Sequence, residues 1–204
     1  MAQVYQKDPK DRILEAALNV VNKNTISGMR MHLIADEAEM VQSNIHYYYK
    51  TKDELMLALQ NYIFEECYTF RKVEKQNSKD DLESQLDIYI NQKKKLILEK
   101  NQYDFAEIDF WVQGKINDEI RHRFQHSYEE WRREIGEILD KYCKDLDEAT
   151  RRQLPYIVVS MLEGATIQYG ISRECFDVEA YFASVKRMVM NEVRREEEQL
   201  RGKR

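Results

Sequence analysis

The chain contains few of the residues that interrupt helices: two prolines and six glycines in 204 residues. Apolar residues make up 43% of it and charged residues 34%, a balance that suits a folded helical protein. Aromatic residues reach 11%, whereas a disordered chain has fewer aromatics and more proline, serine and glycine. The composition therefore excludes a disordered chain and is compatible with one large domain or two small ones sharing a core.

Cysteine and long apolar runs are also scarce. Cys67, Cys143 and Cys175 are far apart, odd in number, and form no Cys-x-x-Cys pair. This pattern indicates reduced thiols in a cytoplasmic protein rather than a disulfide framework. The N-terminal residues contain no apolar signal core, and no run approaches the roughly 18 apolar residues of a transmembrane helix. We therefore expect a soluble cytoplasmic protein with no membrane partner.

An excess of positive charge is absent as well, since 32 Lys and Arg face 37 Asp and Glu, a net charge of −5. That balance excludes a protein that coats nucleic acid non-specifically and a generally basic membrane binder. The charge is unevenly spread, because residues 1–52 carry seven Lys and Arg against six Asp and Glu, and the remainder carries 25 against 31. A local DNA-binding face near the N-terminus is compatible with these numbers.

Helical periodicity runs through the chain, and no strand pattern, repeat or low-complexity linker interrupts it, so the expected fold class is all-α. Asp8-Pro9 predicts a helix start, Thr51-x-x-Glu54 has the form of a capping box, and Pro155 should kink or restart its helix. The expected helices cover residues 9–23, 30–38, 42–48, 51–74, 80–100, 118–142 and 147–170, with a last one from 177 and an aromatic-rich stretch at 101–114. Their expected caps or first residues include Ser78 or Asp80, Asp118, Asp147 and Asp177.

Two of these helices, 30–38 and 42–48, are short and are joined by a turn of about three residues. Buttressed by the longer helix at 9–23, they form a helix-turn-helix, the second helix of which fits a DNA major groove about 12 Å wide. Ile45 and Tyr48 are expected to face the core of this unit. The side chains left toward solvent are Gln42, Ser43, Asn44, His46 and Tyr47.

The exposed side chains of the second helix have the chemistry of base and phosphate recognition. Gln and Asn bond bidentately to adenine edges, and Ser and Tyr hydroxyls suit phosphates or bases. Lys52 lies at the start of the next helix, where its charge and the exposed N–H groups together favour a phosphate.

These segments resemble the DNA-binding domain of TetR-family transcriptional regulators. The matching residues are Ile13-Leu14-Ala16-Ala17, Ile34-Ala35-x-x-Ala38 and Tyr48-Tyr49-x-x-Lys52-x-x-Leu55, aligned without gaps over about forty-five residues. The resemblance implies base- or phosphate-facing roles for Gln42, Ser43, Asn44 and Tyr47, and phosphate contacts for Tyr48 and Lys52. It also implies a DNA-binding domain at residues 1–54 and a larger helical domain at 55–204 that binds a ligand and dimerises.

The chain departs from the family pattern at three places. Glu39 stands at the turn position that is usually Gly, where a side chain is expected to cause strain. Val41 replaces the usual Ser cap of the recognition helix. Met29-Arg30 replaces a pair of threonines, and Arg30 is expected to take over the lost hydroxyl contact to DNA.

The family resemblance further implies an effector pocket among the C-terminal helices, apolar with a few polar anchors. Carboxylates among aromatics suit an apolar or aromatic-stacking ligand that carries a positive charge. The candidate lining residues are Tyr103, Phe105, Glu107, Phe110, Trp111, Tyr128, Trp131, Tyr156, Gln168 and Tyr169, with Asp109 and Gln113 as further anchors. Small residues on the last two helices predict a four-helix homodimer interface through Ser160, Gly164, Ala165, Ala180, Ala183 and Ser184.

Two other functions remain open on these residues. Glu119-x-x-His122, with His126 four residues later, matches half of a di-metal helix motif, but no second Glu-x-x-His follows. No phosphate loop or nucleophile elbow occurs, so neither an enzyme nor a cofactor is expected. The second alternative is an interaction protein that kept this fold and lost DNA binding.

Lys93-Lys94-Lys95 is expected to be a solvated helix face rather than a nucleic-acid patch. The favoured function is a repressor that leaves a palindromic DNA operator when a small molecule binds.

Overall fold

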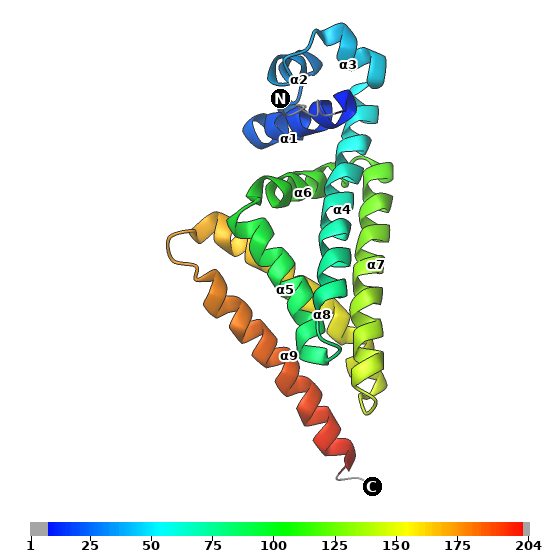
Figure 1. Ribbon diagram of the computed structural model, residues 1–204, viewed down its shortest axis with the longest axis vertical. Helices are drawn as coiled ribbons and strands as arrows, with labels where there is room; N and C mark the ends of the chain where they lie inside the picture. Colours follow the sequence, from blue (N-terminus) through cyan, green and yellow to red (C-terminus); the bar gives the residue numbers. More distant parts are fainter. Residues whose placement is uncertain (1–7, 202–204) are drawn as a thin grey trace, which may run out of the picture. The chain divides into compact units, whose positions relative to one another are not determined.

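The computed structural model describes residues 8–201, which form nine helices and no strand (Figure 1). The all-α fold class is therefore confirmed for these residues. The helices are α1 (Pro9–Gly28), α2 (Met31–Glu37), α3 (Gln42–Tyr48), α4 (Lys52–Asn77), α5 (Leu82–Leu98), α6 (Asn101–Gln113), α7 (Asp118–Tyr142), α8 (Glu148–Ser172) and α9 (Val178–Arg201). None of the helices within residues 8–201 is long and apolar enough to cross a membrane.

Side-chain caps fix most of the predicted helix starts. Asp8, Asp147 and Asp177 each accept a backbone N–H from the first turn of their helix, as predicted. The cap of α5 was predicted wrongly, because Asp81 rather than Ser78 or Asp80 accepts the backbone N–H of the first turn. At α7 the capping oxygen belongs to Asn117, which lies one residue before Asp118.

Pro155 does not restart its helix, which was one of the two outcomes expected there: α8 is a single helix from Glu148 to Ser172. The proline ring is buried in the packed interior, and a Cβ added to Gly136 of α7 would lie 3.9 Å from its Cγ. Packing against the neighbouring helix thus holds the backbone helical through a residue that lacks an N–H donor.

The helices group into two compact units, each with its own core. Unit 1 consists of residues 8–66 and 101–124, and unit 2 of residues 67–100 and 125–201. Helices α4 and α7 each contribute their N-terminal part to unit 1 and their C-terminal part to unit 2. The boundary expected between residues 54 and 55 falls near the start of α4, whereas the contacts of unit 1 continue to residue 66 and include α6.

Unit 1 is built around the apolar face of α1. Ile13, Ala17 and other α1 residues are buried together with Ile34 of α2, Ile45 of α3 and Leu59 of α4. Both α2 and α6 pack against α1, and α3 packs against α2. The short helices α2 and α3 therefore rest on a packed core rather than on their own helical propensity.

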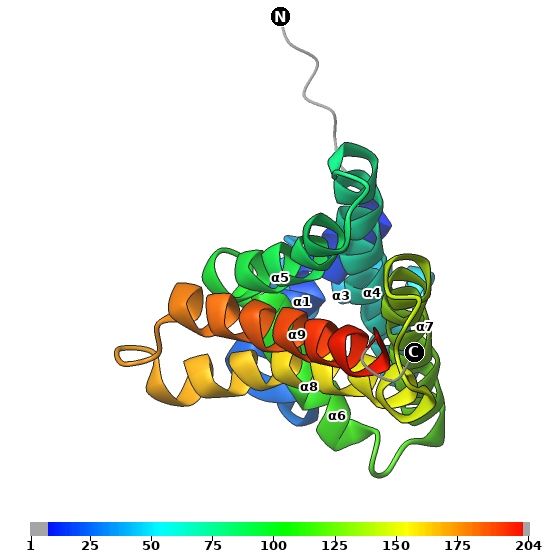
Figure 2. The ribbon, with the colours of Figure 1, turned by 90° about the horizontal axis from the view of Figure 1, so that it is seen from below.

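Unit 2 is organised around α5, α8 and α9, which pack against one another. Figure 2 shows α8 and α9 running side by side in opposite directions after the turn that joins them. The core of unit 2 is apolar. Its most deeply buried side chains include those of Tyr89, Ile135, Leu139, Leu162 and Phe182.

Candidate DNA-binding and effector-binding sites

Helix α3 has one buried residue, Ile45, and a polar face that is exposed to solvent. Ile45 is completely buried, and Tyr48 is half-buried, as the spacing predicted. Tyr49, which follows the helix and lies four residues after Ile45, is more deeply buried than Tyr48. The exposed side chains are the predicted set of Gln42, Ser43, Asn44, His46 and Tyr47.

Tyr47 is the most exposed aromatic ring of this face, with 73% of its surface accessible. Its ring meets Tyr48 edge to face at 5.1 Å, and Lys50 Nζ lies 5.7 Å from its centre. Gln42 Nε2 and His46 Nε2 lie 3.3 Å apart on the same outer face. The helix therefore offers an amide, an imidazole and a phenol to solvent, next to a cation.

The turn between α2 and α3 has the geometry that favours glycine. Glu39 has φ 53°, and the N–H of Met40 donates to Ala35 O at 2.9 Å while that of Glu39 donates to Asp36 O at 3.2 Å. This pair of bonds is a Schellman ending, in which the left-handed position usually holds glycine. The strain expected at Glu39 is therefore a feature of the backbone. Val41 gives α3 no side-chain cap.

Two cations predicted to contact DNA are anchored to the backbone at the C-terminal end of α1. Lys52 Nζ donates to Ile26 O at 2.8 Å, and Arg30 donates to Ser27 O at 2.8 Å and Met29 O at 2.9 Å. Burial lowers the pKa of Lys52, and the nearby Arg30 charge lowers it further. Both side chains are thus held in place, while Arg30 itself remains exposed.

Helix α6 clamps the same backbone segment from another side. Thr25 has φ 60° and ψ 167°, a region that residues other than glycine rarely occupy, and so it breaks the regular course of α1. The N–H of Ile26 donates to the Asp109 carboxylate, and Gln113 Nε2 donates to Ser27 Oγ at 3.2 Å. Asp109 and Gln113 were expected to anchor an effector. The structure instead engages them in holding the end of α1.

The ten residues expected to line a pocket are divided between the two units. Tyr103, Phe105, Glu107, Phe110 and Trp111 lie on α6 in unit 1, and the other five belong to unit 2. On α6, Tyr103 and Phe110 are buried, and the Tyr103 ring stacks on Tyr62 at 6.3 Å, whereas Phe105 and Trp111 are exposed. In unit 2, Tyr128 and Trp131 meet edge to face at 6.0 Å, Tyr169 is buried, and Tyr156 and Gln168 are exposed.

Unit 2 contains buried charged residues that sequence reasoning missed. Lys93 Nζ lies 3.0 Å from Glu163 Oε1, and the side chains are 2% and 10% exposed. The interpretation of residues 93–95 as a solvated face is therefore wrong for Lys93. Its spacing from Ile90 and Ile97, three and four residues away on the apolar side of α5, was the available signal.

A second buried polar group surrounds Glu134 of α7. Its Oε2 accepts from Tyr89 Oη at 2.9 Å and lies 3.3 Å from Arg71 Nε and 3.2 Å from Lys75 Nζ. Arg71 also donates through one terminal nitrogen to Gln92 Oε1 at 3.2 Å. Burial raises the pKa of Tyr89, and the Glu134 charge raises it further, so the phenol stays a neutral donor.

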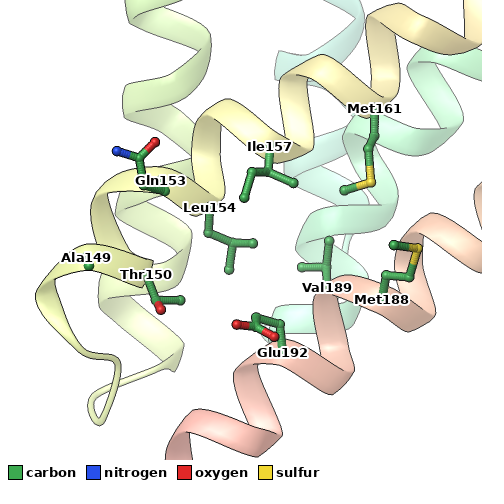
Figure 3. A pocket seen from close by; sticks show the side chains of 9 residues that line it. All are labelled: Ala149, Thr150, Gln153, Leu154, Ile157, Met161, Met188, Val189 and Glu192. Atoms are coloured by element: carbon green, nitrogen blue, oxygen red, sulfur yellow. The ribbon is translucent and has the colours of Figure 1, made fainter.

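The surface of unit 2 carries a groove of about 470 Å³ between α8 and α9, drawn in Figure 3. It is lined by Ala149, Thr150, Gln153, Leu154, Ile157, Met161, Met188, Val189 and Glu192. Ile157, Ile167, Ile171 and Met188 are exposed along these two helices, which gives them an apolar outer face.

The small residues expected at a dimer interface mostly lie on this outer face. Ser160, Ala180 and Ala183 are exposed, and Gly164 and Ser184 are half-buried. Ala165 is completely buried in the core of unit 2, so it packs within the protomer.

The half motif for a metal site lies on exposed turns of α7. Glu119 accepts from Arg123 Nε at 3.0 Å, and His122 and His126 are both exposed. Within residues 8–201 no three or more His, Cys, Asp and Glu side chains gather as a metal ion would require.

Comparison with known proteins places the N-terminal part of the chain in a family. Residues 13–59 match the sequence model of the bacterial regulatory proteins of the TetR family. The chain is also 34% identical over 64 residues to an uncharacterised helix-turn-helix transcriptional regulator of Xanthobacter autotrophicus. That match covers 31% of this chain and only 32% of the relative, so it concerns about a third of each protein.

The fold extends the likeness over most of the chain. A transcriptional regulator from Saccharomonospora viridis, solved with choline, superposes with a TM-score of 0.80 at 18% identity, covering 91% of this chain and 97% of that one. A TetR regulator from Haloarcula marismortui gives 0.75 at 18% identity over 91% and 96%. FadR from Bacillus subtilis, solved with stearoyl-CoA, gives 0.73 at 16% identity over 88% and 96%. The TetR-family model thus matches the segment that holds the helix-turn-helix of α2 and α3, and the remaining helices share the fold of these solved regulators.

Proposed function

We propose that this protein is a homodimeric, sequence-specific DNA-binding regulator that represses transcription until a small molecule binds unit 2. The observation that carries the proposal is the outer face of α3. Ile45 anchors a helix whose Gln42, Asn44 and Tyr47 side chains are all free of the core. Amide side chains on a short helix held away from the core suit direct reading of adenine edges in the major groove.

The dimer is proposed through the outer face of α8 and α9. One recognition helix reads few bases, whereas a two-fold pair reads both halves of a palindrome about 34 Å apart. The exposed Ile157, Ile171 and Met188 supply apolar area, and Ser160 and Gly164 let partner backbones approach closely. A stable interface of ordinary size buries about 800 Å² on each partner, and two helices of 24 or 25 residues offer such a surface.

Release from DNA is proposed to follow from ligand-dependent movement of α4. This helix begins at Lys52, beside the clamped end of α1, and continues into unit 2 up to Asn77. A ligand releases DNA only if it binds the non-DNA-binding conformation more tightly, and DNA must then weaken ligand binding by the same factor. Two structurally similar regulators were solved in complex with choline and with stearoyl-CoA, which supports a small-molecule site in proteins of this fold.

Selection of bound sequences from a random DNA pool tests the DNA-binding part of the proposal. We expect a palindrome, a shift in mobility that salt weakens, and two protomers per site. Replacing Asn44 by Ala should change the preferred base at one position of each half-site, at a cost of about 1–3 kcal/mol there. Replacing exposed Asn191 on α9 by Ala is the matched control and should leave the selected sequence unchanged.

Two results would count against the proposal. Recovery of no preferred sequence from the pool would favour the alternative of an interaction protein that has lost DNA binding. Stoichiometric iron, manganese or zinc bound through Glu119 and His122 would favour the metal enzyme instead.

A further inference from the structure

Two buried N–H donors of unit 2 lie close together and make no hydrogen bond of good geometry within residues 8–201. Arg71 Nε and Trp131 Nε1 are shielded from solvent, and neither makes a hydrogen bond within residues 8–201. Trp131 is 9% exposed and the Arg71 side chain 13% exposed. Arg71 Cζ lies 5.9 Å from the centre of the Trp131 ring, so both donors belong to one place where α4 and α7 meet. Buried donors are almost always paired, and two adjacent unpaired ones mark a position suited to an acceptor.

The carboxylate nearest these donors is also shared with a second cation. Glu134 is the carboxylate of this group, and it is shared by Tyr89 Oη and by the cations of Arg71 and Lys75. Arg71 Nε is an ion-pair partner of Glu134 at 3.3 Å but lacks hydrogen-bond geometry toward it. Two cations therefore share the Glu134 carboxylate: Arg71, whose side chain is 13% exposed, and Lys75, whose side chain is 37% exposed.

A positively charged ligand fits this interior less well. It needs a carboxylate that is not already neutralised, whereas Glu134 faces two cations and a phenol and Glu163 is paired with Lys93. Asp109 and Gln113, the expected anchors of a cation, hold the end of α1 in unit 1. The charge balance thus opposes the cationic effector that the composition of the helices favoured.

We propose that unit 2 recognises an effector with an anionic head group, a carboxylate or a phosphate, whose oxygens accept from Arg71 Nε and Trp131 Nε1. The inference rests on the proposed function, in which unit 2 receives the effector. A guanidinium offers a planar fork that matches such oxygens, and the indole N–H adds a second direction. The rest of the effector is apolar, because the surrounding core of unit 2 is built from Ile, Leu, Val and aromatic side chains.

The test uses three probes with the same eight-carbon chain: octanoate, octyl phosphate and octyltrimethylammonium. The chain has two tryptophans, so Trp111→Phe in the full-length protein leaves Trp131 as the reporter. We expect one or both anions to change Trp131 fluorescence saturably, and the cation to have no saturable effect. A response to one anion alone identifies the head group. A stronger response to the cation, or a response to none of the three, overturns the proposal.

Substitutions then test the two donors. In the Trp111→Phe background, Arg71→Met should weaken the responding anion at least roughly tenfold, and Arg71→Lys should weaken it less because the charge is kept. Lys72→Met removes a charge from the exposed neighbouring position and is the matched control. Trp131→Phe keeps the ring but removes the N–H, and the melting-temperature rise caused by the anion should shrink. An unchanged affinity in Arg71→Met, with folding verified by circular dichroism, contradicts the assignment.

Failure of the proposed function gives a different pattern. The protein could select no DNA sequence while an anion still changes Trp131 fluorescence and Arg71→Met weakens that response. The head-group assignment would then be supported, and the proposal of a DNA-binding regulator would be contradicted. If an operator is selected and octyltrimethylammonium releases it while the anions do not, the regulator stands and the head-group assignment falls. Operator release is therefore measured with the same three probes.

Discussion

The backbone N–H of Ile26 donates to the carboxylate of Asp109, which lies 83 positions later in the chain on α6. The carbonyl of the same Ile26 accepts from Lys52 at the start of α4. One peptide segment of unit 1, strained at Thr25, is therefore held by groups from two other helices. A strained backbone persists only where its surroundings fix it, and Asp109 and Lys52 supply that restraint here.

Removal of the Asp109 carboxylate should destabilise unit 1. Ile26 is buried, so Asp109→Ala leaves its N–H without an acceptor, at an expected cost of about 1–3 kcal/mol in the free energy of unfolding. Asp109→Asn keeps an acceptor oxygen and should cost less. Urea unfolding followed by circular dichroism measures both. Glu119→Ala removes an exposed i,i+4 ion pair with Arg123 and should change stability by no more than about 0.5 kcal/mol. Equal effects at positions 109 and 119 would contradict this account.

The turn before the recognition helix should be improved by glycine. Glu39 occupies the left-handed position of a Schellman ending, so Glu39→Gly is expected to stabilise the protein by about 0.5–1 kcal/mol. Asp36→Gly, placed inside α2 at an exposed position, should have the opposite sign, because glycine destabilises a helix interior. Thermal and urea unfolding of the two variants provide the comparison. A loss of stability in Glu39→Gly would show that the Glu39 side chain stabilises the protein by more than its left-handed backbone conformation costs.

The buried ion pair of unit 2 should be sensitive to the loss of one partner. Glu163→Gln removes a negative charge that faces the buried Lys93 ammonium, and a cost of about 3–5 kcal/mol in the free energy of unfolding is expected. Replacing both residues by apolar ones of similar length, Lys93→Met with Glu163→Leu, should restore most of that loss. Lys94→Met, which removes a more exposed ion pair with Glu179, is the control and should cost below about 1 kcal/mol. A double variant no more stable than Glu163→Gln would argue against desolvation as the cause.

Acid should weaken the start of α8 through Asp147. Hydrogen bonds from the Thr150 hydroxyl and from backbone N–H groups hold the pKa of this carboxyl below its ordinary value. A carboxyl with a depressed folded-state pKa stabilises the protein above its unfolded-state pKa near 4 and loses that contribution as pH falls further. Urea unfolding between pH 6 and pH 3 should therefore decline more steeply in the wild type than in Asp147→Asn. If the free energy of unfolding fell equally with pH in both proteins, other carboxyl groups would be responsible for the loss of stability in acid.

The elements of this fold were predictable because their signals are local. Asp8 and Asp147 cap within one turn, and the apolar spacing of α1 and α3 does not depend on distant residues. The outward face of α3 followed from the spacing of Ile45 and Tyr48. The local sequence did not decide whether α8 restarts at Pro155, because that depends on packing against α7.

The interior of unit 2 was not predictable in the same way. Lys93 stands in a run of three lysines that looks solvated, but it is buried and forms an ion pair with Glu163 of α8, 70 positions away. Asp109 looked like a ligand anchor among aromatic residues, yet its partner is a backbone N–H of α1. Pairings between distant segments decide these roles, and a single sequence does not reveal them.

Lys52→Ala should affect both DNA binding and the packing of unit 1. If Lys52 reaches a phosphate, its loss weakens binding to all sequences alike and lowers the slope of log affinity against log salt by about one. Because its ammonium also binds Ile26 O, the variant should unfold at a lower urea concentration, whereas Lys50→Ala, at an exposed position, should not. Salt titrations of operator binding separate the two roles. A destabilised variant with an unchanged salt slope would make Lys52 a positioning residue for the end of α1 and leave the phosphate contact to Arg30 and Tyr48.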